Sequence, residues 1–310
     1  MSRDRRHSEA PAPFWGRRFR DHAALAWAPA KVNLFLEVTG HRDDGYHELE
    51  TLMLAVDLYD MLELSRIDEP AIGLNCNDPS LGNDTNLVVK AAAALHARYS
   101  PEWGAVVRLT KKIPLQAGLG GGSSDAATTL LALNDLWEIH APREELSEVA
   151  ASIGSDVAFF LQPPAAWCTG RGETVEPAPL GQELDLVIVK PPHGCTTAAV
   201  YENLSLPESP RSADAMRKAV HRGNASEIGR ALHNRLEAPA LKIQPEIADV
   251  LRALQAEKPA GVRMTGSGSA CFAVCRDRRE ALRVAAGVRE AAPADLAPEM
   301  VFVVKSWPTV

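Results

Sequence analysis

The stretch Pro114-Leu-Gln-Ala-Gly-Leu-Gly-Gly-Gly-Ser-Ser-Asp125 decides how the chain folds and what it can bind. Its three consecutive glycines, at positions 120–122, allow backbone dihedrals that are closed to other residues and let a bulky anion approach the main chain. Ser123, Ser124 and Asp125 come next, and their side chains suit the N-cap of a helix. Free amides and the positive end of the helix dipole converge at such a helix start. The sequence therefore predicts a phosphate site on a loop that opens a helix.

Two familiar phosphate-binding patterns are absent from this loop. No Gly-Lys-Ser/Thr follows the glycines, which argues against a P-loop NTPase, and Ser123 breaks the GxGxxG pattern of dinucleotide-binding folds. A plain structural alternative is a tight turn between a strand and a helix, with a serine cap and no ligand. The residues that accompany the loop elsewhere in the chain favour the phosphate site.

The segments around the loop alternate between strand-like and helix-like patterns. One strand is predicted with an apolar face (Val32, Leu34, Leu36, Val38) and an opposite, polar face (Lys31, Asn33, Phe35, Glu37). After the loop, the helical spacing of four apolar residues predicts one buried helix face (Ala127, Leu130, Leu133, Trp137). Further strands are expected over residues 52–64, 105–109, 184–189 and 300–305, and helices over residues 87–99, 142–154, 213–232 and 245–254. This is an α+β pattern.

The composition excludes several classes of protein. A length of 310 residues favours two domains, and the net charge of −7 argues against nucleic acid as a partner. Five cysteines without a CxxC pair predict a reducing, cytoplasmic compartment. The apolar runs are too short to cross a bilayer of about 30 Å, so no membrane partner is expected. Residues 1–22 are predicted to be a disordered extension; a transit peptide is the alternative, but Asp4, Glu9 and the scarcity of serine disfavour it.

Four segments together resemble the GHMP superfamily, which is named for galactose, homoserine, mevalonate and phosphomevalonate kinases. They are Ala28-Pro-Ala-Lys-Val-Asn-Leu34, the glycine loop, Gly154-Ser-Asp-Val-Ala-Phe-Phe160 and Met264-Thr-Gly-Ser-Gly-Ser-Ala-Cys-Phe272. Their order and spacing are similar to that family across residues 25–310. The form of the glycine loop, the segment Gly40-His-Arg-Asp-Asp-Gly-Tyr-His47 and the third segment resemble the branch that acts on a cytidine diphosphate-linked methylerythritol.

The resemblance implies a fold of two domains with the active site in the cleft between them. Residues 23–183 would form an ATP-binding catalytic domain similar to domain 2 of ribosomal protein S5, and residues 184–310 a ferredoxin-like domain. It also implies that ATP phosphorylates the 2-hydroxyl of the methylerythritol, in the non-mevalonate route to isoprenoid precursors. Mg²⁺ would bridge the ATP phosphates, with Ser124 as a candidate contact and no assigned protein ligand. A monomer or a weak dimer is expected.

Two charged residues are the catalytic candidates. Asp156 follows Gly154 and could merely cap the next short helix, but the resemblance places the catalytic aspartate of the family here, as the expected base for a substrate hydroxyl. Lys31 could be an ordinary solvated lysine on a strand, on the same face as Asn33. The resemblance instead makes Lys31 the active-site lysine, where its ammonium would keep Asp156 ionised and stabilise charge on the transferred phosphoryl group.

The remaining candidates bind the two substrates. The resemblance implies that ATP contacts Pro114, Leu115, Gln116, Ala117, Gly118, Leu119, Gly120, Gly121, Gly122, Ser123 and Ser124. It implies that the acceptor contacts Asn33, Tyr46, His47, Tyr201, Gly266, Ser267 and Gly268. Tyr46 and His47 would hold the cytosine ring and Tyr201 would supply a second aromatic face, although an aromatic plug at a core edge would explain the pair equally simply. The second glycine turn, at residues 266–270, could likewise be a plain turn rather than a loop that closes on the phosphates.

Two rival functions remain at this point. Another kinase of the same fold could act on homoserine, a sugar or mevalonate; the pair Lys31 and Asp156 disfavours homoserine, and the segment Gly45-Tyr-His47 disfavours the others. A catalytically silent binding protein on this fold is the second rival, and the retention of both charged residues disfavours it.

Overall fold

A computed structural model describes residues 17–20, 22–162, 164–291 and 300–307. Of the expected disordered extension, residues 1–16 and 21 lie outside this description. Arg17–Arg20 departs from the expectation, because it forms strand β1 and pairs antiparallel with the start of β2 (Ala23–His41). None of the helices in the described ranges combines the length and the apolar character that a bilayer span requires.

The first sheet is built on a hairpin of two long strands, β2 and β3 (His47–Ile67). In the described part of the chain it has eight strands, with the main order β1-β2-β3-β5-β4. β6 pairs with β3, β7 pairs with β6, and β9 lies parallel to β2. The bounds of the other strands are β4 (Ile72–Cys76), β5 (Gly104–Thr110), β6 (Ala165–Gly170), β7 (Thr174–Pro177) and β9 (His233–Asn234).

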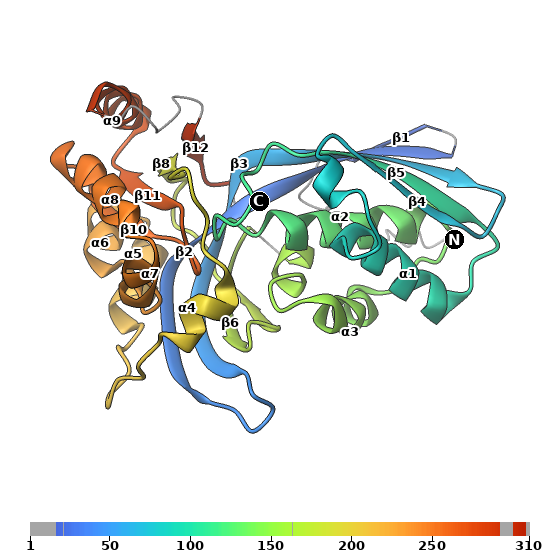
Figure 1. Ribbon diagram of the computed structural model, residues 1–310, viewed down its shortest axis with the longest axis horizontal. Helices are drawn as coiled ribbons and strands as arrows, with labels where there is room; N and C mark the ends of the chain where they lie inside the picture. The colour runs from blue at the N-terminus through green and yellow to red at the C-terminus, as the bar shows by residue number, and fades with distance from the viewer. Residues whose placement is uncertain (1–16, 21, 163, 292–299, 308–310) are drawn as a thin grey trace, which may run out of the picture.

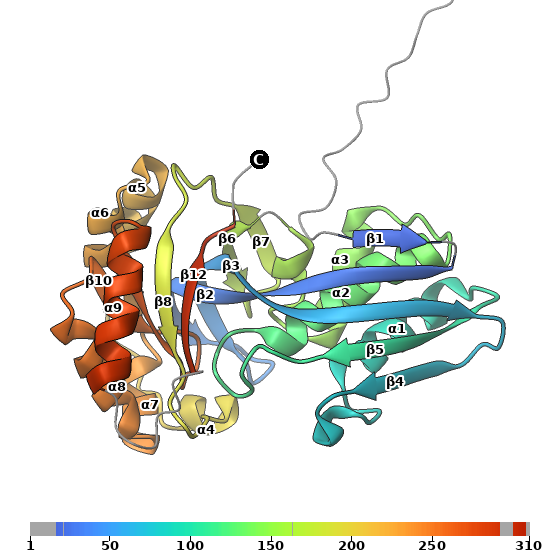
Figure 2. The same cartoon turned by 90° about the horizontal axis from the view of Figure 1, so that it is seen from above.

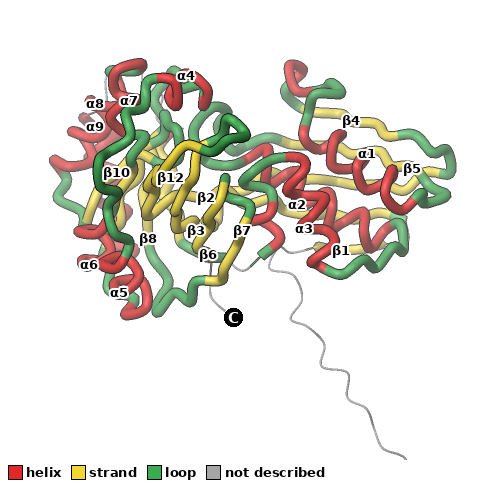
Figure 3. The backbone as a smooth tube through the Cα atoms, turned by 90° about the horizontal axis from the view of Figure 1, so that it is seen from below, coloured by secondary structure: helices red, strands yellow, loops and turns green. Residues whose placement is uncertain are grey.

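Helices α1 (Leu87–Tyr99), α2 (Gly121–Leu136) and α3 (Arg143–Ile153) cover one face of this sheet (Figure 1; Figure 3). Two short 3-10 turns accompany them, η1 (Pro79–Leu81) and η2 (Ala158–Leu161). The predicted apolar face of α2 is confirmed as buried. The prediction was too narrow, however, because Ser124, Thr128 and Thr129 are also buried, so α2 lies inside the domain rather than on its surface.

The second sheet has the order β10-β11-β8-β12, and every neighbouring pair is antiparallel. Taken in chain order, its first strand lies between the third and the fourth, which is the ferredoxin-like arrangement predicted for this half. Figure 2 shows α8 and α9 on the outer side of this sheet, away from β2 and β3. The strands are β8 (Asp185–Val189), β10 (Gly261–Met264), β11 (Cys271–Cys275) and β12 (Val301–Lys305). The helices are α4 (Thr197–Glu202), α5 (Asp214–Arg222), α6 (Ala225–Ala231), α7 (Glu237–Ile243), α8 (Glu246–Ala256) and α9 (Arg278–Ala291).

Strand β2 does not keep the two continuous faces that strict alternation predicts. Its pairing with β3 shifts register between Asn33 and Phe35, which is a β-bulge that changes the side on which later side chains lie. Leu34 and Phe35 therefore pack in one core, whereas Leu36 packs in another. The expected polar face is not solvated either, because Lys31, Asn33 and Glu37 are all buried.

The two sheets share a hydrophobic core beneath the glycine loop. This core joins Val32 of β2 and Leu119 of the loop to Ile188 of β8 and Phe272 of β11. The expected domain boundary at residue 184 falls between β7 and β8, but β9 crosses it to pair with β2. The glycine loop consequently packs against both sheets.

Candidate active site

The glycine loop leads into α2 through two glycines with positive φ. Gly118 has a φ of +72° and Gly120 a φ of +71°, a conformation that glycine adopts without strain. A Cβ added at Gly118 would lie 2.2 Å from the carbonyl oxygen of Thr265, so the second glycine turn packs directly against the first. Main-chain hydrogen bonds from Ser269 to Gln116 and from Ala270 to Ala117 join the two turns.

The predicted serine cap of α2 is wrong. Gly120 is the N-cap, no side chain caps the helix, and the expected cap residues lie inside its first turns. Because Ser124 N donates to Gly120 O at 2.9 Å, the amides of Gly121, Gly122 and Ser123 precede the first intrahelical bond and have no helical acceptor. A side-chain cap would have competed with a ligand for these amides. The start of α2 is thus open for an anion, and all three residues line the cleft.

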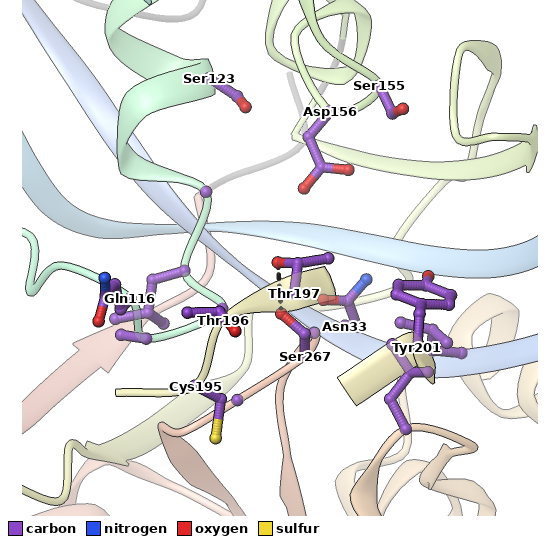
Figure 4. A pocket seen from close by; sticks show the side chains of 18 of the residues that line it. Asn33, Gln116, Ser123, Ser155, Asp156, Cys195, Thr196, Thr197, Tyr201 and Ser267 are labelled. Carbon is purple, nitrogen blue, oxygen red and sulfur yellow. Dashed lines mark hydrogen bonds between the residues drawn. The ribbon is translucent and has the colours of Figure 1, made fainter. Parts of the chain in front are cut away.

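Lys31 and Asp156 face each other inside the cleft, as the sequence predicted. Lys31 Nζ lies 3.5 Å from Asp156 Oδ2, and the lysine side chain is 3% exposed against 31% for the aspartate. Figure 4 shows the Asp156 side chain entering the cleft from the side opposite Thr196, Thr197 and Ser267. The two opposite charges therefore lie within ion-pair distance at the centre of the cleft.

A hydrogen-bond chain aims the Lys31 ammonium. Lys31 Nζ donates to Asn33 Oδ1 at 2.7 Å and to Gly118 O at 2.9 Å. Asn33 Nδ2 donates to Thr51 Oγ1 at 2.8 Å, and Thr51 Oγ1 donates to Phe35 O at 2.7 Å. The direction of every bond is fixed, because the carbonyl at one end only accepts and the ammonium at the other only donates. Thr51 therefore determines that the Asn33 amide turns its oxygen towards Lys31.

The other end of the cleft is built from aromatic side chains. The His47 ring lies 4.7 Å from the Tyr201 ring and 4.3 Å from the His41 ring, measured between centroids. Burial, and then the neighbouring His41, lowers the pKa of His47, so that the imidazole favours its neutral form. Burial, with the charge of Asp156 as a further cause, raises the pKa of Tyr201. Tyr46 remains 52% exposed at the tip of the β2–β3 hairpin.

One cleft of about 1250 Å³ collects nearly all of the predicted site residues. It is lined by both catalytic candidates, by the loop from Pro114 to Ser123, by every predicted acceptor contact and by Ser155. Ser124 does not line it, because its side chain is fully buried in α2. The geometry brings these residues together, while their individual roles stay predictions.

Several lining residues were missed by the sequence reasoning. Lys111, Arg171, Thr51 and Thr197 line the same cleft. Lys111 donates to the buried carboxylates of Asp60 and Asp125. A basic residue directly before the glycine loop was a signal that could have identified Lys111. Arg171 and Thr197 carried no comparable signal, because only the tertiary fold brings their segments to the cleft.

The residues of the cleft suit ATP, but they provide few candidate ligands for Mg²⁺. The described residues contain no group of three or more His, Cys, Asp and Glu side chains arranged to hold a metal. Ser124 Oγ, in the helix residue directly after the open amides of α2, is buried and has no hydrogen-bond partner among those residues. This suits a Mg²⁺ ion that is held chiefly by nucleotide phosphates and water.

Comparison with known proteins identifies similar chains. The family models "GHMP kinases N terminal domain" and "GHMP kinases C terminal" match residues 86–163 and 216–294. A protein of Pelotomaculum thermopropionicum named 4-diphosphocytidyl-2-C-methyl-D-erythritol kinase is 42% identical over 270 residues, which cover 85% of this chain and 93% of that protein. The protein of the same name from Shouchella clausii is 39% identical over 264 residues, covering 84% and 89%.

Solved structures agree with these matches. A crystal structure of 4-(cytidine 5'-diphospho)-2C-methyl-D-erythritol kinase superposes with a TM-score of 0.76 at 34% identity, covering 92% of this chain and 100% of that one. A homoserine kinase from Cytophaga hutchinsonii superposes with a TM-score of 0.75 at 20% identity, covering 93% and 95%. The second match, at its lower identity, shows the shared fold alone.

Proposed function

The chain belongs to the 4-diphosphocytidyl-2-C-methyl-D-erythritol kinases of the GHMP superfamily, and we propose that it phosphorylates the 2-hydroxyl of 4-diphosphocytidyl-2-C-methyl-D-erythritol with ATP. The product would serve the non-mevalonate route to isoprenoid precursors. The observation that carries the proposal is the pair Lys31 and Asp156, 3.5 Å apart in a cleft with an uncapped helix start at one end and aromatic rings at the other.

The nucleotide end works through the main chain. Amides of Gly121, Gly122 and Ser123 at the start of α2 bind the ATP phosphates, and the helix dipole adds to the attraction. Glycine is needed because these amides must approach the phosphates without an intervening side chain. Ser124 would be the candidate protein contact for Mg²⁺, which would supply positive charge to the transferring group when bound.

The acceptor end orients the reacting hydroxyl. The Asp156 carboxylate accepts the hydrogen bond of the 2-hydroxyl and takes its proton as the new oxygen–phosphorus bond forms, while the bond from phosphorus to the ADP oxygen breaks. Lys31, held by Asn33 and Gly118, faces this carboxylate and stabilises negative charge on the phosphoryl oxygens. Tyr46, His47 and Tyr201 hold the cytosine ring.

A coupled assay tests the proposal. ADP release is measured with ATP alone and with ATP plus the cytidylyl substrate, homoserine, galactose or mevalonate. We expect release with the cytidylyl substrate only, and a new phosphate monoester beside an intact diphosphate in the ³¹P NMR spectrum. Turnover of homoserine or galactose, with none of the cytidylyl substrate, would overturn the assignment.

A further inference from the structure

Three strongly basic side chains line the cleft within the described residues, and they differ in how closely carboxylates hold them. Lys31 contacts Asp156, and Lys111 is held between Asp60 and Asp125. The third is Arg171. Its nearest described carboxylate is Glu173, at 3.7 Å between Arg171 Nε and Glu173 Oε1, and its guanidinium makes no hydrogen bond in the described part of the chain.

Arg171 lies in a turn between the Asp156 end and the Tyr46 end of the cleft. Gly170 and Gly172, both with positive φ, flank it between β6 and β7. A Cβ added at Gly172 would lie 3.7 Å from Asp156 Oδ1, so the turn runs beside the acceptor-hydroxyl end. The Arg171 guanidinium lies 4.8 Å from the centre of the Tyr46 ring, which is at the nucleobase end.

The carboxylates near Arg171 have other partners besides its guanidinium. Asp44, an acidic residue of the adjacent hairpin tip, pairs with Arg42 at 3.1 Å, and the charge of Arg171 is the smallest of the causes that lower the pKa of Asp44. Glu173 accepts a hydrogen bond from the Arg171 backbone amide at 2.5 Å, which fixes the turn without the guanidinium. The side chain is 28% exposed, so its head group is accessible from the cleft.

We propose that Arg171 binds the diphosphate of the acceptor substrate and makes the site selective for a cytidine diphosphate over cytidine. This inference rests on the proposed function. In a molecule whose base lies at Tyr46 and whose hydroxyl lies at Asp156, the diphosphate must pass between those two residues, and Arg171 spans that interval. A guanidinium suits the task, because its planar set of donors matches phosphate oxygens in pairs.

The test compares ligands that differ only in phosphate. The affinities of the full chain for cytidine, cytidine monophosphate and cytidine diphosphate are measured by calorimetry, for the natural chain and for Arg171→Met. Methionine keeps the apolar stem against Tyr46 and removes the charge. The matched control is Arg217→Met, since Arg217 also stacks on an aromatic ring, Trp167 at 3.9 Å, but does not line the cleft.

Arg171→Met is expected to weaken diphosphate binding by on the order of 10- to 100-fold, as for the loss of hydrogen bonds to a charged group, and to leave cytidine binding unchanged. The KM for ATP should not move, Arg171→Lys should recover part of the loss, and Arg217→Met should behave as the natural chain. Equal losses for cytidine and cytidine diphosphate would mean that Arg171 only supports Tyr46, and no loss for either would also overturn the inference. These outcomes stay distinct from failure of the proposed function, which would appear as absence of turnover by the natural chain.

Discussion

The two ends of the cleft are built by different means. At the nucleotide end, the loop presents main-chain amides, and it is joined to the C-terminal domain by main-chain bonds such as Ala270 N to Ala117 O at 3.1 Å. At the base end, rings from the β2–β3 hairpin and from α4 meet as side chains, and Tyr46 is half exposed. A backbone site tolerates few changes at its glycines, whereas a side-chain site can be altered one group at a time without disturbing the fold.

The largest effect is expected from replacing Asp156, whose carboxylate lies between the two ends of the cleft. Asp156→Asn should lower kcat by about 10³-fold, because the amide no longer takes the hydroxyl proton. ATP and cytidine diphosphate should bind as before, since neither the α2 amides nor the aromatic rings change. Steady-state kinetics with calorimetry of both ligands checks this, and near-normal turnover would remove Asp156 from the catalytic role.

A pair of matched glycine substitutions tests whether the nucleotide end is the more rigid one. Gly118→Ala places a Cβ 2.2 Å from Thr265 O at a positive φ, so we expect a loss of about 3 kcal/mol or more in unfolding free energy, with weaker ATP binding. Gly45→Ala, at the tip of the β2–β3 hairpin, has an equally positive φ but meets nothing within 4 Å, and should cost only about 1 kcal/mol. Urea denaturation of both variants gives the comparison. Equal losses would show that the close approach at Gly118 does not matter.

The buried carboxylate of Glu37 on β2 allows the side-chain contacts of this strand to be tested by a change of pH. Burial alone would raise the pKa of Glu37, but hydrogen bonds from Arg235 and from the Arg211 and Val38 amides, with the charge of His233, outweigh it and lower the pKa to about 2. From the ordinary value of 4.5, this shift corresponds to about 3 kcal/mol of stability. Because the folded pKa is the lower one, the stabilisation is present above pH 4.5 and is lost as the pH falls towards 2.

Glu37→Gln should therefore lower the unfolding free energy by about 3 kcal/mol at neutral pH, and the difference from the natural chain should vanish near pH 2. Glu48→Gln is the control, because Glu48 pairs with Arg42 on the exposed hairpin and should contribute about 1 kcal/mol or less. Urea titrations across this pH range measure both variants. If the unfolding free energies of Glu37→Gln and the natural chain differ by the same amount at every pH, the charge of Glu37 does not stabilise the fold.

The smallest expected effect concerns the orientation of Lys31. Thr51→Val keeps the shape of the side chain but leaves the Asn33 amide without its fixed acceptor, so we expect kcat to fall roughly 10- to 100-fold while both ligands bind normally. Thr51→Ser retains the hydroxyl and should retain the rate. A valine variant with the natural kcat would mean that Asn33 holds its orientation through Thr265 instead.

Much of the nucleotide end could be predicted from the sequence, because its glycines and charged strand residues belong to short sequence motifs. The loop, the helix after it and the proximity of Lys31 to Asp156 followed from such patterns together with the family resemblance. The uncapped start of α2 did not, since a serine suits an N-cap wherever propensity alone decides, and here the left-handed Gly120 begins the helix earlier.

The base end was harder to predict for a physical reason. Arg171 reaches the cleft, and Thr51 reaches Asn33 near Lys31, only through contacts made by the tertiary fold, and a short segment of sequence carries no record of such contacts. The bulge after Asn33 had the same effect on β2, because strict alternation placed Leu36 on the wrong face. Side chains within a recognisable motif, such as Tyr46 and His47, could thus be predicted from the sequence, while those outside any motif became visible only in the folded chain.

A crystal structure of the chain with a non-hydrolysable ATP analogue and cytidine diphosphate tests the central claim most directly. We expect the analogue's phosphates within hydrogen-bond distance of the Gly121, Gly122 and Ser123 amides, with the terminal phosphorus facing Lys31 and Asp156. Phosphates bound elsewhere, or a terminal phosphorus turned away from those two side chains, would contradict the account.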